Sequence, residues 1–463
     1  MLLTLSILLL IAALWSALSY RRDVLHPGFW TNIGFIGYAA GGLYYVAYGY
    51  DGASFLNLAD FKDQDRSWWF DFSIVIVWVG YLACNAGFWL GNTCFRVRRL
   101  DPAVAVMRMV PSPAFVRTMA KYSAIFLIII GTVYWLYVAQ RLSGSVLGLF
   151  RNVAAYRYLV ADAGLTILPY HLAYVGIQIW MLSWLGEKRG RAIGLFFIPL
   201  GVVIILTTGR ISLAGGFGLS ALLAYFMSVR GCVRIGIISK ILMALIPFSL
   251  IFYFYRQMTS YVYIGREQNF ALLEASDYSS GSYIISYKYD YILTSIFGGG
   301  NIPDLQQIIL IIKGMQDSVL PLAWGATYVD WISNFFSQNS IQSVGYRILN
   351  AYFPDKIGGP TPGMIGEAIL NFGYFGFLAV FIFCFAMTMI YTLSFNSKSY
   401  LVKFLYCKFI VGTWALFIKV DSSLFLGYFW AAFPLLIAWF VLYVFYGLFK
   451  KMERHDGVQG GLS

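Results

Sequence analysis

The sequence predicts an all-α integral membrane protein that crosses the bilayer many times, and three observations carry this prediction. Of the 463 residues, 60% are hydrophobic and only 12% are charged, and the mean hydropathy is +0.71; soluble domains are far less apolar. Apolar stretches of about 20 residues, enough to cross about 30 Å of hydrocarbon, recur along the chain. Basic residues gather in alternate loops between these stretches.

We expect about 11 transmembrane helices in two groups, separated by one large outer loop. The expected spans are 2–20, 28–50, 71–93, 121–140, 166–185, 192–208, 211–229, 236–255, 366–393, 401–418 and 422–449. The domain organisation follows: helices one to eight in 1–255, the outer loop in 256–365, helices nine to eleven in 366–449, and a cytoplasmic tail in 450–463.

The distribution of charge predicts an N-terminus outside and a C-terminus in the cytoplasm. The first apolar stretch lacks a basic leader and a cleavage site, and Arg21 and Arg22 follow it. The predicted cytoplasmic loops and tail hold 20 of the 33 basic residues but only five of the 21 acidic ones, as the positive-inside rule requires. Topology thus accounts for the net charge of +12, and nucleic-acid binding is not expected.

Disulfides, metals and cofactors are not expected. The five cysteines fall in predicted spans or cytoplasmic loops, outside any oxidising compartment. The cysteines and the three histidines show no zinc-ligand spacing. Asp63 and Asp65 have the spacing that holds metal-bound nucleotides in many glycosyltransferases, but between Lys62 and Arg66 they predict a solvated acidic turn.

The outer loop is the predicted working surface. The longest cytoplasmic loop, 94–120, is too short for a nucleotide-binding domain, whereas a loop as long as 256–365 usually carries function. Ile308–Ile312 and Val319–Phe336 are apolar enough to predict amphipathic helices that lie on the bilayer. Tyrosines crowd the start of the loop, Tyr289 among them, where their rings could stack on sugars or form an interfacial aromatic belt.

Basic residues on the outer side are candidate phosphate ligands, because the positive-inside rule predicts few of them there. They include Arg151, Arg157, Arg210, Arg256, Arg266, Arg347 and Lys419. Arg210 lies in a tight turn between two spans, where its guanidinium could bind a lipid-linked diphosphate or snorkel to headgroups. Lys419 could pair with Asp421 or contact substrate. His171, near the outer end of the fifth span, is a secondary candidate.

Glu367 is the acid of a broken segment, residues 358–376, in which Pro360, Pro362 and Gly363 precede the ninth span. Its expected place is the first turn, where it could satisfy the helix macrodipole or, if desolvated, act as a general base on a sugar hydroxyl. Asn371 lies four residues later, on the same helix face. Gly373 and Gly376 are expected to leave room for a neighbouring helix.

These motifs and the overall architecture resemble the Wzy-type O-antigen or oligosaccharide repeat-unit polymerases of bacterial envelopes. The local resemblance rests on the Thr208–Gly209–Arg210 turn and on Pro362–Glu367 followed by Asn371–Gly376. It implies a multi-pass glycosyltransferase of the bacterial inner membrane, with a periplasmic active site and no cofactor or metal. Such an enzyme would join oligosaccharide repeats carried on undecaprenyl diphosphate. The pair of arginine-rich repeats that some of these polymerases carry in two outer loops is not recognisable in this sequence.

The resemblance also implies roles for the candidate residues. Glu367 would accept the proton of the attacking hydroxyl, and Arg210 with Arg266 would stabilise the leaving diphosphate. The expected substrate-binding residues are Arg151, Arg157, Arg256, Arg347, Lys419, Asn371, His171 and Tyr289. Membrane lipid, a chain-length regulator and a flippase would be further partners.

Two alternatives are an O-antigen ligase and a lipid-linked oligosaccharide transporter. A ligase is expected to carry a histidine in its large outer loop, and 256–365 has none. A transporter is expected to place polar groups near the middle of the membrane and to show two matching halves, of which the sequence gives no sign.

Overall fold

The computed structural model describes only part of the chain. The described residues are 1–20, 23, 25–48, 63–95, 114–146, 172–173, 175–177, 180, 200–201, 203–204, 302–330, 344–352, 362–396, 405–406, 409–414, 417–418, 421–422, 425, 433, 440 and 444. Across these ranges the protein consists of helices and turns without a strand, which agrees with the all-α prediction.

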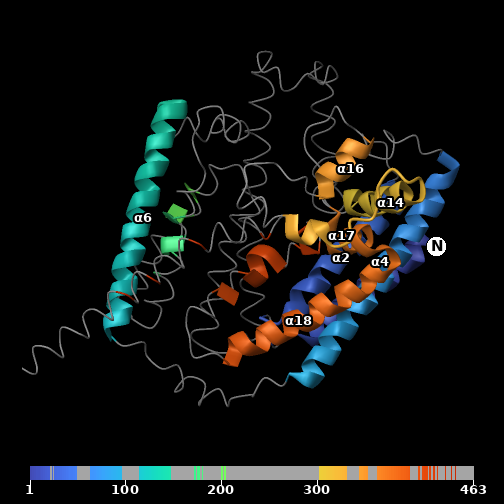
Figure 1. Cartoon of the computed structure of the whole chain (residues 1–463), viewed down its shortest axis with the longest axis horizontal. Helices are drawn as coiled ribbons and strands as arrows, with labels where there is room; N and C mark the ends of the chain where they lie inside the picture. Colours follow the sequence, from blue (N-terminus) through green and yellow to red (C-terminus); the bar gives the residue numbers. More distant parts are fainter. Residues whose placement is uncertain are drawn as a thin grey trace, which may run out of the picture. The chain divides into compact units, whose positions relative to one another are not determined.

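The chain divides into two compact units. Unit 1 comprises Met1–Arg99, Val233–Ile235 and Glu274–Gly427, and unit 2 comprises the remainder. Unit 1 contains the helices α1 (Leu2–Ser19), α2 (Pro27–Tyr48), α4 (Asp63–Cys94), α14 (Ile302–Gln316), α16 (Val344–Tyr352), α17 (Gly363–Phe372) and α18 (Gly376–Asn396), with a 3-10 turn, η3 (Gly373–Phe375), and a π-helical turn, η4 (Ile410–Trp414) (Figure 1).

Unit 2 contains α6 (Ala114–Ser143), a 30-residue helix. One face of α6 buries Trp135, Val138 and Ala139 against Ala173 and Ile204. Gly131 permits this packing, because a Cβ at this position would lie 2.4 Å from the backbone nitrogen of Ala173.

Four described helices are long and apolar enough to cross a membrane. They are Leu2–Ser19, Trp68–Cys94, Ala124–Arg141 and Gly363–Asn396, and they coincide with the expected first, third, fourth and ninth spans. These helices support the class of membrane protein. The expected second span is the helix α2. Most of the residues of the other six expected spans lie outside the described residues.

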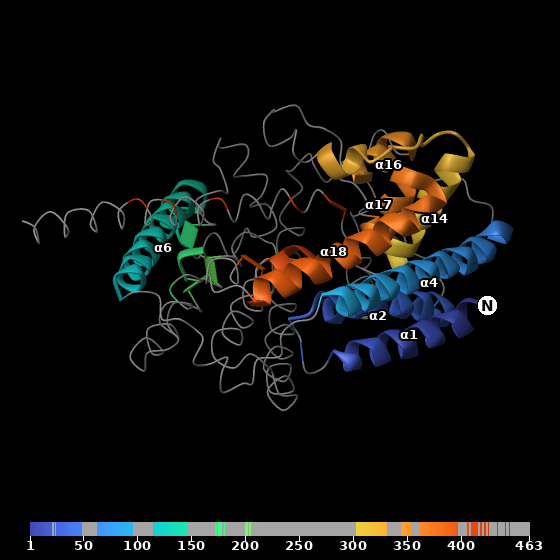
Figure 2. The same cartoon turned by 60° about the horizontal axis from the view of Figure 1, so that its bottom comes forward.

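The long helices of unit 1 pack side by side (Figure 2). α2 runs antiparallel to α1, since Gly28 packs on Tyr20 while Gly42 packs on Ser6. It is also antiparallel to α4, because Phe35 contacts Tyr81 and Tyr45 stacks on Phe70.

α18 runs in the same direction as α4. Gly87 and Gly91 of α4 allow their close approach: a Cβ at Gly87 would lie 2.4 Å from the carbonyl oxygen of Phe381, and one at Gly91 2.6 Å from Cβ of Thr388. Such small residues let membrane helices pack backbone against backbone. α1, α4 and α18 therefore share one direction and α2 has the other, as an alternating path through a membrane requires.

The expected ninth span is not one continuous helix. It begins at Gly363, three residues before the expected start, and η3 separates the ten residues of α17 from the 21 of α18. Gly373 adopts a φ of 59° at the break, a conformation that favours glycine. At about 1.5 Å per residue, α18 alone is about 31 Å long, enough to cross the hydrocarbon.

Gly373 and Gly376 have a different role from the one expected. A Cβ at Gly376 would lie 2.3 Å from the carbonyl oxygen of Ala368, in α17 itself, whereas one at Gly373 would make only ordinary contacts. The two glycines thus permit the sharp turn from α17 into α18, and the prediction that they make room for a separate neighbouring helix is wrong.

The helix that covers Ile308–Ile312 is not an amphipathic surface helix. All eight residues from Leu305 to Ile312 are buried, and eight consecutive residues point to every side of a helix. α14 packs against α2, α4 and α17 and is therefore inserted into unit 1. Of the expected helix Val319–Phe336, residues 326–330 are helical, but Val319–Gly325 is not. The backbone of Val319–Gly325 crosses the end of α17, where the N–H groups of Ala323 and Trp324 donate to the carbonyls of Leu370 and Asn371. Residues 331–336 lie outside the described residues.

Asp63 and Asp65 form the first turn of α4. The backbone of the expected acidic turn is therefore helical.

Candidate functional site

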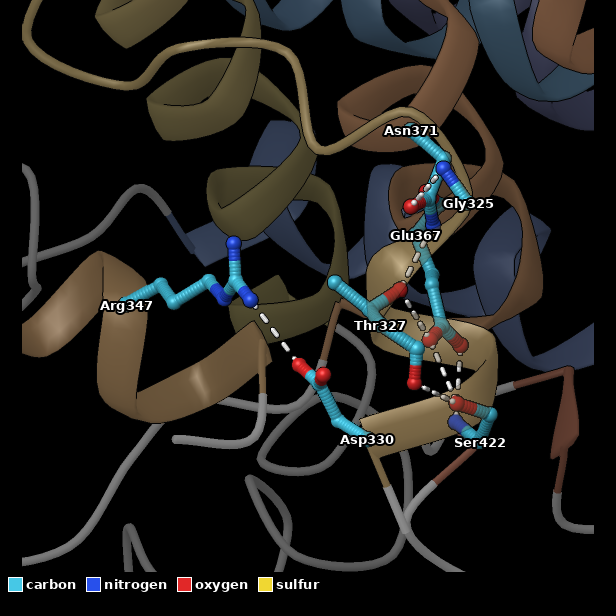
Figure 3. Close-up of polar contacts among 7 residues, drawn as sticks. All are labelled: Gly325, Thr327, Asp330, Arg347, Glu367, Asn371 and Ser422. Carbon is cyan, nitrogen blue, oxygen red and sulfur yellow. Dashed lines mark hydrogen bonds and ion pairs between the residues drawn. The ribbon is translucent and has the colours of Figure 1, made fainter. Parts of the chain in front are cut away.

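The strongest candidate site is a buried polar network around the carboxyl group of Glu367 (Figure 3). Glu367 lies in the middle of α17 and is completely buried. The Thr327 hydroxyl donates to its Oε1 at 2.7 Å. The Ser422 hydroxyl oxygen lies 2.6 Å from Oε1, and the Ser422 backbone N–H donates to Oε2 at 2.7 Å. Three segments far apart in the sequence thus meet at one carboxyl group.

Asn371 holds the next layer of the network. Its Oδ1 accepts the backbone N–H of Gly325 at 2.9 Å, which fixes the orientation of the amide. Its Nδ2 donates to the Thr327 hydroxyl at 2.6 Å and to the carbonyl of Glu367, one turn earlier, at 2.9 Å. Asn371 thereby ties the 323–327 segment to α17 and positions Thr327.

Ser422 brings a third segment to the site. Its hydroxyl also lies 3.0 Å from the carbonyl oxygen of Thr327. Asp421, the preceding residue, is 1% exposed, so a second carboxyl group is buried beside the first. The carbonyl of Ile418, four residues before Ser422, accepts a hydrogen bond from Tyr38 of α2 at 2.8 Å. This bond fixes the path of the chain into the site.

The position of Glu367 rules out the helix-capping role. α17 begins at Gly363 and has no acid in its first turn, whereas the macrodipole acts mainly on that turn. The carboxyl group accepts hydrogen bonds from the 327 and 422 segments instead. The prediction that Glu367 lies in the first turn is therefore wrong, because the helix starts earlier than the sequence pattern indicated.

The network lies beside the middle of α4. Ile365, two residues before Glu367, packs on Gly80 of α4, where an added Cβ would come within 2.5 Å of its Cδ1. Gly80 is near the midpoint of the apolar stretch Trp68–Cys94, about 18 Å from one end and about 21 Å from the other. The site is thus beside the middle of α4 rather than at its end.

Arg347, an expected substrate ligand, forms an ion pair with Asp330. The guanidinium Nη2 lies 2.8 Å from Oδ2, and both side chains are partly exposed. Asp330 lies three residues after Thr327, so this pair is near the network in sequence, but Arg347 makes no hydrogen bond to Glu367 (Figure 3).

The other expected site residues lie outside the described residues. They are Arg151, Arg157, Arg210, Arg256, Arg266, His171, Lys419 and Tyr289. Of the expected site residues, the described structure brings only Glu367 and Asn371 together. Among the described residues, no group of three or more His, Cys, Asp or Glu side chains is placed to hold a metal ion.

Thr327 and Ser422 were not expected from the sequence. Isolated hydroxyl residues carry no pattern, and both lie far from Glu367 along the chain. For Ser422 the available signal was its place directly after Asp421, in the turn where Lys419 and Asp421 had been singled out.

No family model, curated protein or solved structure matches the chain.

Proposed function

We propose that this protein is a glycosyltransferase of the bacterial inner membrane that polymerises undecaprenyl-diphosphate-linked oligosaccharide repeats into O-antigen or a related surface polysaccharide. One observation carries the proposal: Glu367, the acid of the motif that resembles these polymerases, is the centre of a buried polar network beside membrane helices. Ionisable residues buried among membrane helices are costly and are usually retained for function.

The reaction forms one carbon–oxygen bond and breaks another, and it transfers one proton. A hydroxyl oxygen of one lipid-linked repeat attacks the anomeric carbon of the other glycan, and the bond from that carbon to the diphosphate oxygen breaks. Glu367 takes the hydroxyl proton, and the undecaprenyl diphosphate leaves with its negative charge, stabilised by Arg210 and Arg266. The energy comes from the glycosyl diphosphate bond, so no nucleotide is consumed.

Access to Glu367 is the structural requirement of this mechanism. Among the described residues, every hydrogen bond to its carboxyl group comes from Thr327 or Ser422, and the group is buried. The acceptor hydroxyl must therefore replace one of these donors, and Ser422, which contacts both oxygens, is the one whose displacement frees the carboxylate most fully.

The direct test is incubation of the purified protein with one defined undecaprenyl-diphosphate-linked repeat, without nucleotide or divalent metal. Separation of the products by length is expected to reveal a ladder of glycans. Unchanged substrate, with a correctly folded protein, would refute polymerisation.

A lipid-linked oligosaccharide transporter is the second candidate, and the broken span favours it. Transporters often place their sites near the middle of the membrane between interrupted helices, and α17, η3 and α18 form such an interrupted helix with Glu367 beside the middle of α4. In liposomes, a transporter would move the intact lipid-linked repeat between leaflets and leave its length unchanged.

A further inference from the structure

The hydrogen atoms of the Glu367 network can be counted, because each donor has a fixed number of them. Six contacts join Glu367, Thr327, Asn371 and Ser422. The side-chain amide of Asn371 supplies two hydrogens, and the Thr327 hydroxyl, the Ser422 hydroxyl and the Ser422 backbone N–H supply one each. Five hydrogens are therefore available for six contacts.

The missing hydrogen can be located. Both Asn371 hydrogens are used on the Thr327 hydroxyl and the Glu367 carbonyl, so the Thr327 hydrogen points to Glu367 Oε1. The single Ser422 hydroxyl hydrogen is shared by two contacts, the Thr327 carbonyl at 3.0 Å and Glu367 Oε1 at 2.6 Å. A carbonyl oxygen can only accept. If Ser422 donates to it, the short contact with Oε1 needs a hydrogen on the carboxyl group.

The surroundings of Glu367 favour the same assignment. Within the described part of the chain, no lysine, arginine or histidine forms a hydrogen bond or an ion pair with it. Among the described residues, the nearby titratable groups are Asp421, also buried, and Tyr328, which follows Thr327. Two buried carboxyl groups disfavour simultaneous ionisation, and burial of a charged carboxylate is costly.

We propose that Glu367 binds a proton in this arrangement, so that its network is a proton-binding site inside unit 1. Oε1–H donates to the Ser422 hydroxyl, which donates to the Thr327 carbonyl, and Oε2 accepts the Ser422 N–H. All six contacts then contain a hydrogen. The inference rests on contact geometry and burial and does not depend on the proposed function.

A protonated carboxyl group cannot act as a base, so the resting site is inactive in that role until Glu367 releases its proton. Proton release also removes the hydrogen between Oε1 and Ser422, so occupancy of the site by a proton and the position of the 421–422 segment are linked.

Infrared spectroscopy of the purified full-length protein tests the proposal, because the carbonyl of a carboxylic acid absorbs apart from the bands of a carboxylate. The spectrum of the wild type minus that of Glu367→Gln at neutral pH is expected to show a carboxylic acid band. The matched control is Asp317→Asn, which removes an exposed acid paired with Lys313; its difference spectrum should show carboxylate bands only. Carboxylate bands alone for Glu367→Gln would overturn the proposal.

A second measurement needs no variant at Glu367. Dicyclohexylcarbodiimide is apolar and reacts with protonated carboxyl groups, and peptide mass mapping locates the adduct. Glu367 of the folded wild-type protein should be modified, and the yield should fall as the pH is raised. Absence of the adduct at every pH, or a yield that rises with pH, would contradict a bound proton. Neither readout requires polymerisation, so this inference and the proposed function can fail separately.

Discussion

Ser422 contacts both oxygens of the Glu367 carboxyl group, with its backbone N–H 2.7 Å from Oε2 and its hydroxyl oxygen 2.6 Å from Oε1. The two residues are 55 positions apart, and both are buried. This pair joins the segment that follows Ile418 to α17. It therefore links Glu367, the acid of the 358–376 segment, to the 421–422 segment, which is distant from it in the sequence.

The Ser422 hydroxyl should contribute to stability. Ser422→Ala removes the contacts of this hydroxyl with Oε1 of Glu367 and with the Thr327 carbonyl, and it leaves buried polar atoms unpaired. The loss should lower the free energy of unfolding by about 1–3 kcal/mol. Thermal unfolding in detergent measures the loss. Ser19→Ala, which alters an exposed serine at the end of α1, is the control and should change stability by less than about 0.5 kcal/mol. Equal effects would show that the buried hydroxyl contributes nothing particular.

Asn371 should protect the backbone of the 323–327 segment. Asn371→Ala removes the acceptor of the Gly325 N–H and the donor to Thr327, so the Gly325 amide should exchange its hydrogen with solvent faster. Hydrogen exchange read by mass spectrometry measures this on peptides that contain residue 325. Asn396→Ala, at the exposed end of α18, is the matched control. Unchanged protection in Asn371→Ala would contradict the bridging role of its amide.

His26 should make stability depend on pH. Its ring is 3% exposed and stacks on Tyr20 with 4.4 Å between centroids. Nδ1 accepts the Gly28 N–H, and Nε2 lies 3.0 Å from Oδ1 of Asn92, so the neutral ring satisfies both contacts. Burial lowers the pKa of His26 from 6.5 to about 4, although the hydrogen bond with Asn92 opposes the shift.

The direction in which stability changes with pH follows from the number of protons that His26 binds in the folded and unfolded states. Between about pH 6.5 and pH 4 the unfolded chain binds a proton at His26 and the folded protein does not, so stability falls as the pH is lowered through this window. The contribution, fully present above about pH 6.5, amounts to about 3 kcal/mol. Unfolding in detergent across this range should show a steeper decline for the wild type than for His26→Phe. Parallel curves for the two proteins would refute the assignment of this pH dependence to His26.

Much of the fold was predictable because the membrane imposes strong constraints on composition. Long apolar stretches must be helices in hydrocarbon, so α1, α4, α6 and α18 were located from hydropathy alone. The interruption at Gly373 was not, because Gly363–Asn396 is apolar on both sides of it. The sequence predicts a surface helix for α14 because it lies between predicted loop residues, whereas the burial of Leu305–Ile312 depends on contacts with α2, α4 and α17.

The site was predictable only at its centre. Glu367 and Asn371 lie one turn apart on one helix, a local relationship that periodicity reveals. Thr327 and Ser422 reach them from residues 40 and 55 positions away from Glu367, and nothing local in the sequence specifies those contacts. The start of α17 at Gly363 was not predictable either, because it depends on the packing of that glycine against the carbonyl oxygen of Ile418. A Cβ at Gly363 would lie 2.2 Å from this oxygen.

The expected topology makes a prediction about labelling. After replacement of the native cysteines by serine, Ser280→Cys should react with a membrane-impermeant maleimide applied from outside, and Ala105→Cys should react only when the inner side is opened. The reason is the excess of positive charge assigned to the loop that contains residue 105. The reverse pattern would invert the protein in the membrane and exclude an outer active site.

The most direct test of the proposed function compares chain lengthening by matched variants. Purified wild-type protein, Glu367→Gln, Arg210→Ala and the control Asn396→Ala are each incubated with one defined undecaprenyl-diphosphate-linked repeat, and the products are separated by length. We expect a ladder from the wild type and from Asn396→Ala, and none from Glu367→Gln or Arg210→Ala, although both are inserted and folded. A normal ladder from Glu367→Gln would remove this carboxyl group from the mechanism, and no ladder from the wild type would contradict the assignment as a polymerase.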